Sequence, residues 1–265
     1  MKTMTRANLS YLTVLLTVAA AVADIPKGSS VSYRRLPGAE RQLSQADQDY
    51  LRGVQLAHGE GVAQDYAQAA TFYLSAARKG HVAAQYNLAY LYEHGLGVAR
   101  DFKQAAAWYR KAALQGDAEA QNNLGVLYAT GRGVPHRDAE AAHWYRLAAA
   151  QSDPEAMSNL GMMYLQGRGM KRDLIEAFKW IRQAAESGYA VAQNNLALMY
   201  SKGQAVARDY IWAYTWFDIA ADKLSACTKL RDEIAKEMKP EEIQRAQTRV
   251  EIKRAQISER AKDVH

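Results

Sequence analysis

The sequence predicts an all-α solenoid of about five 36-residue helix-turn-helix repeats, followed by C-terminal helices that cap the array. The first observation is a block of Ala and aromatic residues at 101–116, DFKQAAAWYRKAALQG, which recurs at a constant interval without insertion or deletion. Its tryptophan column, meaning the equivalent position in each copy, contains Phe72, Trp108, Trp144, Trp180 and Trp216. The second observation is a pair of helical patterns in every copy. A fixed period of this length indicates stacked repeats that bury their apolar faces against one another.

The composition supports a helical array and narrows the classes of partner. Of the 265 residues, 49% are hydrophobic and only five are proline, which excludes a disordered chain. The formal net charge is +6, but Lys and Arg alternate along the sequence with Asp and Glu. We therefore expect no nucleic-acid partner, because proteins that bind nucleic acids gather their cations in one patch. Cys227 is the single cysteine, so no internal disulfide can form, and we expect it to be semi-buried.

The N-terminal 1–23 stretch is typical of an export signal. Lys2 and Arg6 precede an apolar run at 9–22, and small residues fit a cleavage site near Ala23-Asp24. We predict a protein that is periplasmic or secreted after cleavage. The alternative is an uncleaved signal that acts as a membrane anchor, which is the only membrane contact expected.

A linker is predicted between the signal and the repeats. Residues 24–44 contain Pro, Gly and Ser among charged side chains, and they show neither a helical nor an alternating pattern. This stretch is therefore predicted to be a disordered arm.

Each repeat is predicted to contain two helices. Ala84, Leu88 and Leu91 lie at helical spacing and predict a first helix at about 82–94 of the second unit. The Ala and aromatic block predicts a second helix at about 101–115. The five predicted units are 45–80, 81–116, 117–152, 153–188 and 189–222, which together form the repeat region 45–222.

Recurring Gly and Asp residues predict how these helices end and begin. The glycines that can end the first helix in a left-handed conformation are Gly59, Gly95, Gly131, Gly167 and Gly203. The glycines that permit a tight return two residues later are Gly61, Gly97, Gly133 and Gly169. The fifth unit has Ala205 there, so we expect its turn to relax. The predicted N-caps of the second helices are Asp65, Asp101, Asp173 and Asp209, whereas the third unit has Arg137 in that column.

Small and large side chains are predicted to divide the packing between them. The residues that keep the first helix thin where the second helix crosses it are Ala89, Gly125, Gly161 and Ala197. We expect each ring of the tryptophan column to be mostly buried against the next repeat, with a gain of about 2–3 kcal/mol apiece.

The period stops after Asp222, and 223–265 is predicted to form capping helices. A short helix is expected at 224–237, and a last one from Pro240 to about Lys262. The narrow stripe Ile243, Ala246, Val250 and Ile257 predicts that one side of this last helix docks on the fifth repeat. A coiled-coil contact with another chain is the alternative.

No pattern in the chain indicates catalysis or metal binding. The six histidines are His58, His81, His94, His136, His143 and His265, and no carboxylate or thiol set accompanies them at ligand spacing. There is no phosphate loop, no His-Glu zinc motif and no serine with a lysine three residues on. We therefore expect no enzyme, no metal site and no small-molecule cofactor.

The repeating unit resembles a known family. It has the form A-x-x-x-L-G-x-x-Y-x-x-G-x-G-V, then D-x-x-x-A-x-x-W-Y-x-x-A-A-x-x-G. In the second unit the matching residues are Leu88, Tyr92, Gly95, Gly97, Val98, Asp101, Ala105, Trp108, Tyr109, Ala112, Ala113 and Gly116. This pattern, over about 45–222, resembles the Sel-1-like repeat family, a relative of the tetratricopeptide repeat. The resemblance implies a right-handed αα superhelix whose first helices line the concave face. It also implies an adaptor in membrane-associated complexes, envelope signalling, exopolysaccharide control or host contact.

Columns that vary between copies are predicted to hold the binding specificity. On the first helices these columns lie at i, i+4 and i+7 and therefore share one face. The candidate residues are Tyr86, Asn122, Ser158 and Asn194, then Tyr90, Val126, Met162 and Leu198, then Glu93 and Leu165. Beside them lies a recurring amide at Asn87, Asn123, Asn159 and Asn195, which either forms structural hydrogen bonds between repeats or grips a bound peptide backbone.

Three hypotheses of function follow, in decreasing order of support. The first is an exported adaptor that binds another protein or peptide segment through the concave face. The second is a cell-wall or glycan-binding protein, which requires Tyr86 and Tyr90 to be accessible beside Glu93. The third is a cryptic hydrolase, which requires a cluster of titratable groups that the linear sequence does not reveal.

Overall fold

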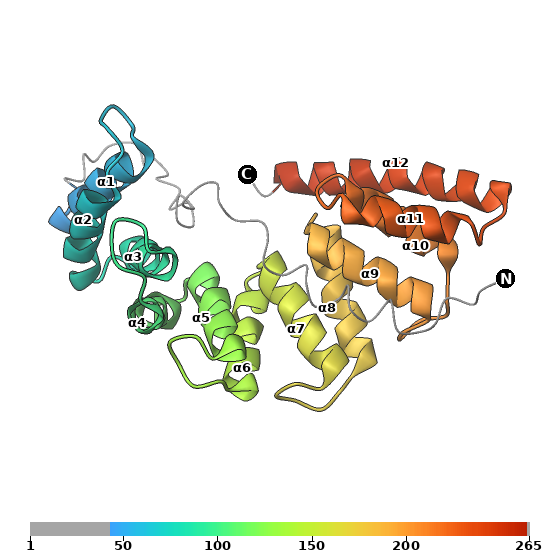
Figure 1. Ribbon diagram of the computed structural model, residues 1–265, viewed down its shortest axis with the longest axis horizontal. Helices are drawn as coiled ribbons and strands as arrows, with labels where there is room; N and C mark the ends of the chain where they lie inside the picture. Colours follow the sequence, from blue (N-terminus) through green and yellow to red (C-terminus); the bar gives the residue numbers. More distant parts are fainter. Residues whose placement is uncertain (1–42, 264–265) are drawn as a thin grey trace.

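A computed structural model describes residues 43–263 as α-helices joined by short loops (Figure 1). Within this range there are twelve helices and no strand, which confirms the predicted all-α class. The predicted signal at 1–23 lies outside the described residues. The predicted linker at 24–44 also lies outside them, except for its last two residues. None of the helices at 43–263 combines the length and apolar character that a membrane span requires.

The helices pair into five hairpins that stack in file and form an arc (Figure 1). The first helices of the hairpins are α1 (Gln45–His58), α3 (Val82–His94), α5 (Ala118–Thr130), α7 (Pro154–Gln166) and α9 (Ala190–Lys202). The second helices are α2 (Tyr66–Arg78), α4 (Phe102–Leu114), α6 (Asp138–Ala150), α8 (Leu174–Glu186) and α10 (Tyr210–Ala221). In the view of Figure 1, α3, α5 and α7 lie on the inner side of the arc, and α4 and α6 lie on its outer side. The predicted solenoid is confirmed.

The helix ends follow the predicted Gly and Asp positions. Gly95 has φ +70° and ends α3, and the glycines of its column do the same in the other repeats. Asp101 Oδ1 accepts hydrogen bonds from the backbone N–H groups of Lys103 and Gln104 at 2.8 and 3.1 Å. Arg137, at the equivalent position before α6, makes no capping hydrogen bond with its side chain. Short-range chemistry therefore sets where each helix starts and stops.

The second glycine column makes the contact between repeats. A Cβ atom on Gly97 would collide with the backbone of Tyr66, at the first turn of α2 in the preceding repeat. Gly133 has the same relation to Phe102 at the first turn of α4. The missing side chain lets each loop rest directly on the preceding repeat.

The last turn does not relax at Ala205, so that prediction is wrong. Ala205 keeps φ +65°, as the glycines of the column do. Two backbone hydrogen bonds hold this loop, from Gln204 N–H to the Met199 carbonyl at 2.9 Å and from Asp209 N–H to the Tyr200 carbonyl at 3.1 Å. The same pair of bonds recurs in the other repeats, and it imposes a left-handed conformation that costs an alanine about 1 kcal/mol.

The side chains of the tryptophan column lie in the core or pack against it. Trp216 is 2% exposed, and Trp108 and Trp144 are each 8% exposed, as predicted. Phe72 and Trp180 are partly buried and pack against the core, so most of each ring is covered, as expected. A Cβ atom on Gly125 would lie 2.7 Å from the ring of Tyr145, which confirms that small residues keep the first helices thin.

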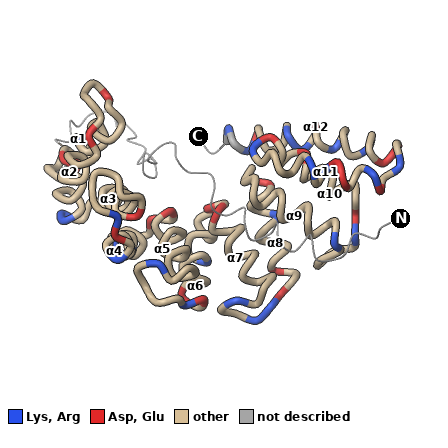
Figure 2. The backbone as a smooth tube through the Cα atoms, viewed as in Figure 1, with Lys and Arg blue, Asp and Glu red and all other residues tan. Residues whose placement is uncertain are grey.

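Many acidic and basic residues of the turns lie at opposite edges of the stack, although some pair, as Arg168 does with Asp138 at 2.6 Å. Figure 2 shows acidic residues at the start of α5 and of α7, and basic residues in the loops that follow these two helices. The acidic residues are Asp117, Glu119, Asp153 and Glu155, and the basic ones are Arg132, Arg137, Arg168, Lys171 and Arg172. The separation follows from the hairpins, because every turn before a first helix lies at one edge of the stack and every loop after it at the other.

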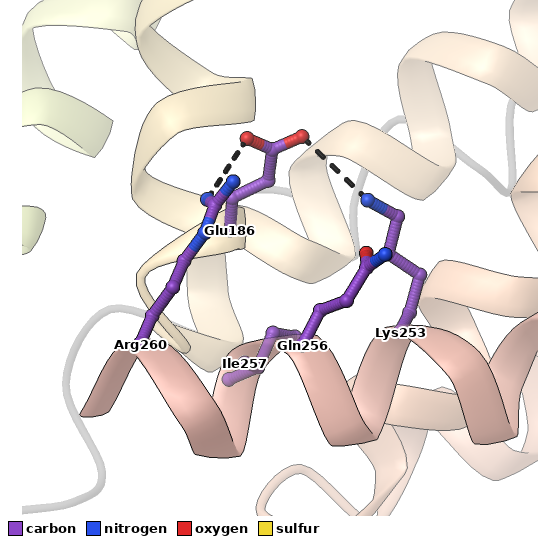
Figure 3. A pocket seen from close by; sticks show the side chains of 5 residues that line it. All are labelled: Glu186, Lys253, Gln256, Ile257 and Arg260. Atoms are coloured by element: carbon purple, nitrogen blue, oxygen red, sulfur yellow. Dashed lines mark hydrogen bonds and ion pairs between the residues drawn. The ribbon is translucent and has the colours of Figure 1, made fainter. Parts of the chain in front are cut away.

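The C-terminal helices α11 (Ala226–Ala235) and α12 (Pro240–Asp263) follow the fifth hairpin. α12 packs on α10 and buries Ala246 and Val250. Its basic residues also reach the end of α8, where Glu186 lies 3.2 Å from Arg260 and 3.9 Å from Lys253 (Figure 3). The apolar stripe of α12 is therefore used within the chain, on the fifth repeat.

Candidate protein-binding face

The concave face is the inner side of the arc, formed by α3, α5, α7 and α9. Two of the predicted columns are partly exposed there in every repeat. The first contains Tyr90, Val126, Met162 and Leu198. The second contains Glu93, Ala129, Leu165 and Ser201. These columns continue across four repeats and form a mostly apolar surface that other proteins can reach.

The column of Tyr86, Asn122, Ser158 and Asn194 is buried in all four repeats, so its expected exposure is wrong. Tyr86 is 4% exposed, and its ring packs 5.6 Å from that of Tyr109. These side chains fill the space between neighbouring repeats, which explains why they differ in size from copy to copy. A role for them in binding stays a prediction.

The recurring amide forms hydrogen bonds between successive repeats. Asn159 Nδ2 donates to Asn122 Oδ1 at 3.0 Å, and Asn123 Nδ2 donates to the Tyr86 hydroxyl at 3.5 Å. Asn87 is fully buried, whereas Asn123, Asn159 and Asn195 keep partly exposed side chains. Asn123 and Asn159 therefore have the structural role that was one of the two predicted for this column.

Glu93 is held in place from the neighbouring helix. The Tyr109 hydroxyl donates a hydrogen bond to Glu93 Oε2 at 2.8 Å. Complete burial raises the pKa of Tyr109 well above its usual value, and the charge of Glu93 raises it further. Tyr109 is therefore a permanent donor, and it fixes the direction in which this carboxylate points.

Two acidic residues, one turn closer to the helix starts, are not among the residues predicted from the sequence. Glu119 and Glu155 lie at equivalent positions of α5 and α7, seven residues before Val126 and Met162. Seven residues are two helical turns, so each carboxylate shares a face with the apolar residue that follows it. Extending the predicted stripe backwards by this spacing would have found both residues.

The surroundings of these carboxylates disfavour their charged forms. Burial raises the pKa of Glu119, and the charge of Asp117 adds to the shift. Glu155 has an exposed side chain, but desolvation by the surrounding protein atoms raises its pKa too. Asn122 donates to Glu155 and partly offsets that shift.

Comparison with known proteins identifies the repeats. The family model described as Sel1 repeat matches 50–81, 82–117, 118–153, 154–189 and 190–223, which is more than half of the chain. The chain belongs to the Sel1 repeat family. Sel1 repeats are scaffolds for protein–protein interaction, and they are typically not enzymes.

Two solved structures resemble this Sel1 repeat protein over most of its length. The protective antigen c5321 of uropathogenic Escherichia coli, which has an SLR fold, is 35% identical with a TM-score of 0.77 over 82% of this chain. This chain spans only 47% of the c5321 structure. A Sel1 repeat protein from Oxalobacter formigenes is 34% identical with a TM-score of 0.69, over 72% of this chain and 76% of that one. Among curated proteins, no sequence matches this chain significantly.

Three of the histidines in the described residues have local structural contacts. His81 Nδ1 accepts from the backbone N–H of Ala84 and caps α3, and the His94 ring stacks on Tyr90 at 4.0 Å. His136 lies 3.1 Å from Asp138 in the loop before α6. In the described part of the chain, no three His, Cys, Asp or Glu residues are placed to hold a metal ion.

Proposed function

We propose that this Sel1 repeat protein is an exported adaptor, periplasmic or secreted, that binds another protein through its concave face. The observation that carries the proposal is the partly exposed column of Tyr90, Val126, Met162 and Leu198, with one residue from each of four stacked repeats. This column presents apolar contacts at regular intervals, which suits the side chains of a peptide segment or a helix. Envelope signalling, complex assembly and host contact are the processes in which such an adaptor would act.

The same face gives less support to glycan binding. That alternative requires aromatic rings and carboxylates that are accessible together. Tyr86 is buried, and Glu93 already accepts a hydrogen bond from Tyr109. Tyr90 alone remains accessible, and its ring stacks on His94.

We expect photo-cross-linking to place the partner on the concave face. A photoreactive residue at Val126 or Met162 should give a discrete adduct in cells that produce the full chain. The same residue at Arg146, which is exposed on α6 at the outer side, should give none. A Met162→Lys change should lower the adduct at Val126 by about tenfold or more, because it places a charge among apolar contacts.

Circular dichroism provides the control for this experiment. Met162 is only partly buried, so the lysine variant should keep its helix content. Adducts of equal yield from position 146, or unchanged adducts in the folded lysine variant, would reject the concave face as the binding surface.

Export is supported by the sequence and by one relative. Lys2 and Arg6 ahead of the apolar run at 9–22 have the order of an export signal. The similar c5321 protein is described as a protective antigen, and we take this description as support for export.

Fractionation of a Gram-negative host that produces the full chain tests this part of the proposal. We expect the protein in the periplasm or the medium, with an N-terminus near Asp24 by mass spectrometry. Membrane retention of a chain that still carries 1–23 would replace the cleaved signal by an uncleaved anchor. A full-length chain in the cytoplasm would contradict export altogether.

A further inference from the structure

A cavity of about 440 Å³ lies between α12, the end of α10 and the turn that joins α8 to α9. Its lining includes Gly188 from this turn, Ile219 from α10 and Ile257 from α12. Small-molecule sites in proteins have volumes of about 300–1,000 Å³, so the cavity is large enough to hold a small ligand. None of the residues that line it belongs to the columns of the concave face.

Two contacts hold α12 beside the cavity. Arg254 of α12 donates a hydrogen bond from Nη2 to Asp222 Oδ1 at 2.7 Å, and the same nitrogen lies 3.2 Å from the carboxylate of Asp218. A Cβ atom on Gly188 would lie only 3.2 Å from Ile257, so α12 also touches the turn before α9. The charges of Arg254 and Asp222 are therefore already paired within the chain.

The repeats themselves show which polar atom of the cavity lacks its usual partner. In the second repeat, Gln85 Oε1 accepts a hydrogen bond from Gln115 Nε2 at 2.7 Å, and the third repeat has the same bond at 2.8 Å. The equivalent residues of the fifth repeat are Gln193 and Lys223, and no such bond joins them. Gln193 is 3% exposed, and its Nε2 donates to the Ala185 carbonyl at 3.2 Å.

The second polar atom of Gln193 is an accessible acceptor. Within residues 43–263, no donor forms a hydrogen bond with Gln193 Oε1. This oxygen is not sealed from solvent, and Gln193 lines the cavity. We conclude that Gln193 Oε1 faces the cavity, where it can accept an N–H group from a ligand.

Lys223 supplies a charge that the cavity does not neutralise. Its side chain is exposed, and in the described part of the chain no carboxylate lies within ion-pair distance of its amine, because Asp222 pairs with Arg254 instead. The apolar part of the lining consists of Ile219, which is 6% exposed, and the partly buried Ile257. The cavity thus offers a cation, a hydrogen-bond acceptor and two aliphatic side chains.

We propose that this cavity binds an N-acylated aliphatic amino acid, either free or as the C-terminal residue of a peptide. The carboxylate of such a ligand pairs with the Lys223 amine, and its amide N–H donates to Gln193 Oε1. Its aliphatic side chain packs against Ile219 and Ile257. A basic ligand would instead place its cation beside Lys223. The site lies outside the concave face, so it is independent of the proposed function.

Saturation-transfer NMR with the purified full chain tests the inference. The probe is N-acetyl-leucine, compared with N-acetyl-leucine amide, which has no carboxylate, and with N-acetylglycine, which has no aliphatic side chain. We expect N-acetyl-leucine to bind with a Kd of about 1 mM, as suits a ligand of its size, and the other two to bind at least about tenfold more weakly. Equal binding of the acid and its amide, or no binding of the acid, would overturn the inference.

Single substitutions locate the binding. Lys223→Met keeps the aliphatic stem but removes the charge, and it should weaken binding of N-acetyl-leucine by about tenfold or more. The matched control is Lys103→Met on α4, which makes the same change in net charge three repeats away and should leave binding within about twofold. Equal effects of the two substitutions would overturn the assignment to this cavity.

Gln193→Met tests the acceptor separately. Met157 occupies the same column in the fourth repeat and is 7% exposed, so we expect the variant to fold. Loss of the hydrogen bond should weaken binding of N-acetyl-leucine by about fivefold. Unchanged binding in the folded variant would contradict the role of Gln193 Oε1.

Hydrogen exchange and a peptide complete the test. Bound N-acetyl-leucine should slow exchange along 240–263, because Arg254 and Ile257 of α12 line the cavity, and should leave exchange along 82–94 unchanged. Unchanged exchange along α12 at saturating ligand would overturn the placement. The peptide Gly-Ser-Gly-Leu then distinguishes the two sources of ligand, because it should bind as tightly as N-acetyl-leucine if the cavity receives a peptide C-terminus and more weakly if it receives the free acid.

Discussion

Replacing Gly133 by alanine is expected to destabilise the fold by about 2–4 kcal/mol. The added Cβ atom would fall on the carbonyl group of Phe102, at the first turn of α4 in the preceding repeat. The clash forces a shift of well-packed backbone, which costs about 1–3 kcal/mol. The φ of +70° adds about 1 kcal/mol of conformational strain for any residue with a side chain. The loss should be measured as the free energy of unfolding in urea, followed by circular dichroism.

Gly61→Ala is the matched control for this prediction. Gly61 occupies the same column at φ +72°, but a Cβ atom there would meet nothing within 4 Å, because no repeat precedes this one in the described residues 43–263. We expect it to cost only the conformational strain of about 1 kcal/mol. If the two variants lose the same stability, the contact between repeats is not what requires glycine at position 133.

The stacked-hairpin fold was predictable because each repeat contacts its immediate neighbours in the same way. Asp101 caps its helix through groups two and three residues away, and Gly95 ends its helix through its own backbone conformation. Neither feature depends on distant parts of the chain, so the local pattern was sufficient. The backbone conformation of Ala205 was not predictable from its local pattern, because hydrogen bonds across the loop override the conformational preference of a single residue.

One of the three columns predicted for the concave face is buried instead of exposed. The prediction treats variation between copies as a sign of exposure, but residues packed between repeats also vary. Asn122 and Tyr86 are buried residues of different type in the same column. Asn122 is hydrogen-bonded by Asn159 of the next repeat, and Tyr86 is hydrogen-bonded by Asn123 of the next repeat. Such pairs can change together without reaching solvent. Glu119 was missed because alanine or valine fills its column in two other repeats, which hides the pattern.

Replacing Trp216 by alanine is expected to be the most costly change to the C-terminal end of the array, at about 4 kcal/mol. Trp216 is 2% exposed, and its ring lies 6.5 Å from that of Trp212. The Lys253 amine of α12 is 5.9 Å from the centre of the Trp216 ring, so the capping helix covers the side of the repeat that no further hairpin covers. Removing the ring leaves a cavity beneath α12.

Trp180→Ala tests whether the large cost expected for Trp216→Ala comes from the burial of Trp216 beneath α12. Trp180 fills the same column of the fourth repeat but is only partly buried, so its loss should cost less than about half as much. Hydrogen exchange should also separate the two variants, because only the loss of Trp216 removes packing that holds α12 on α10. Faster exchange along 240–263 in the Trp216 variant, with normal exchange there in the Trp180 variant, is the expected result. Equal losses of stability, or an unchanged α12 in both, would mean that α12 is held mainly by its ion pairs with Glu186 and Asp222 rather than by the ring beneath it.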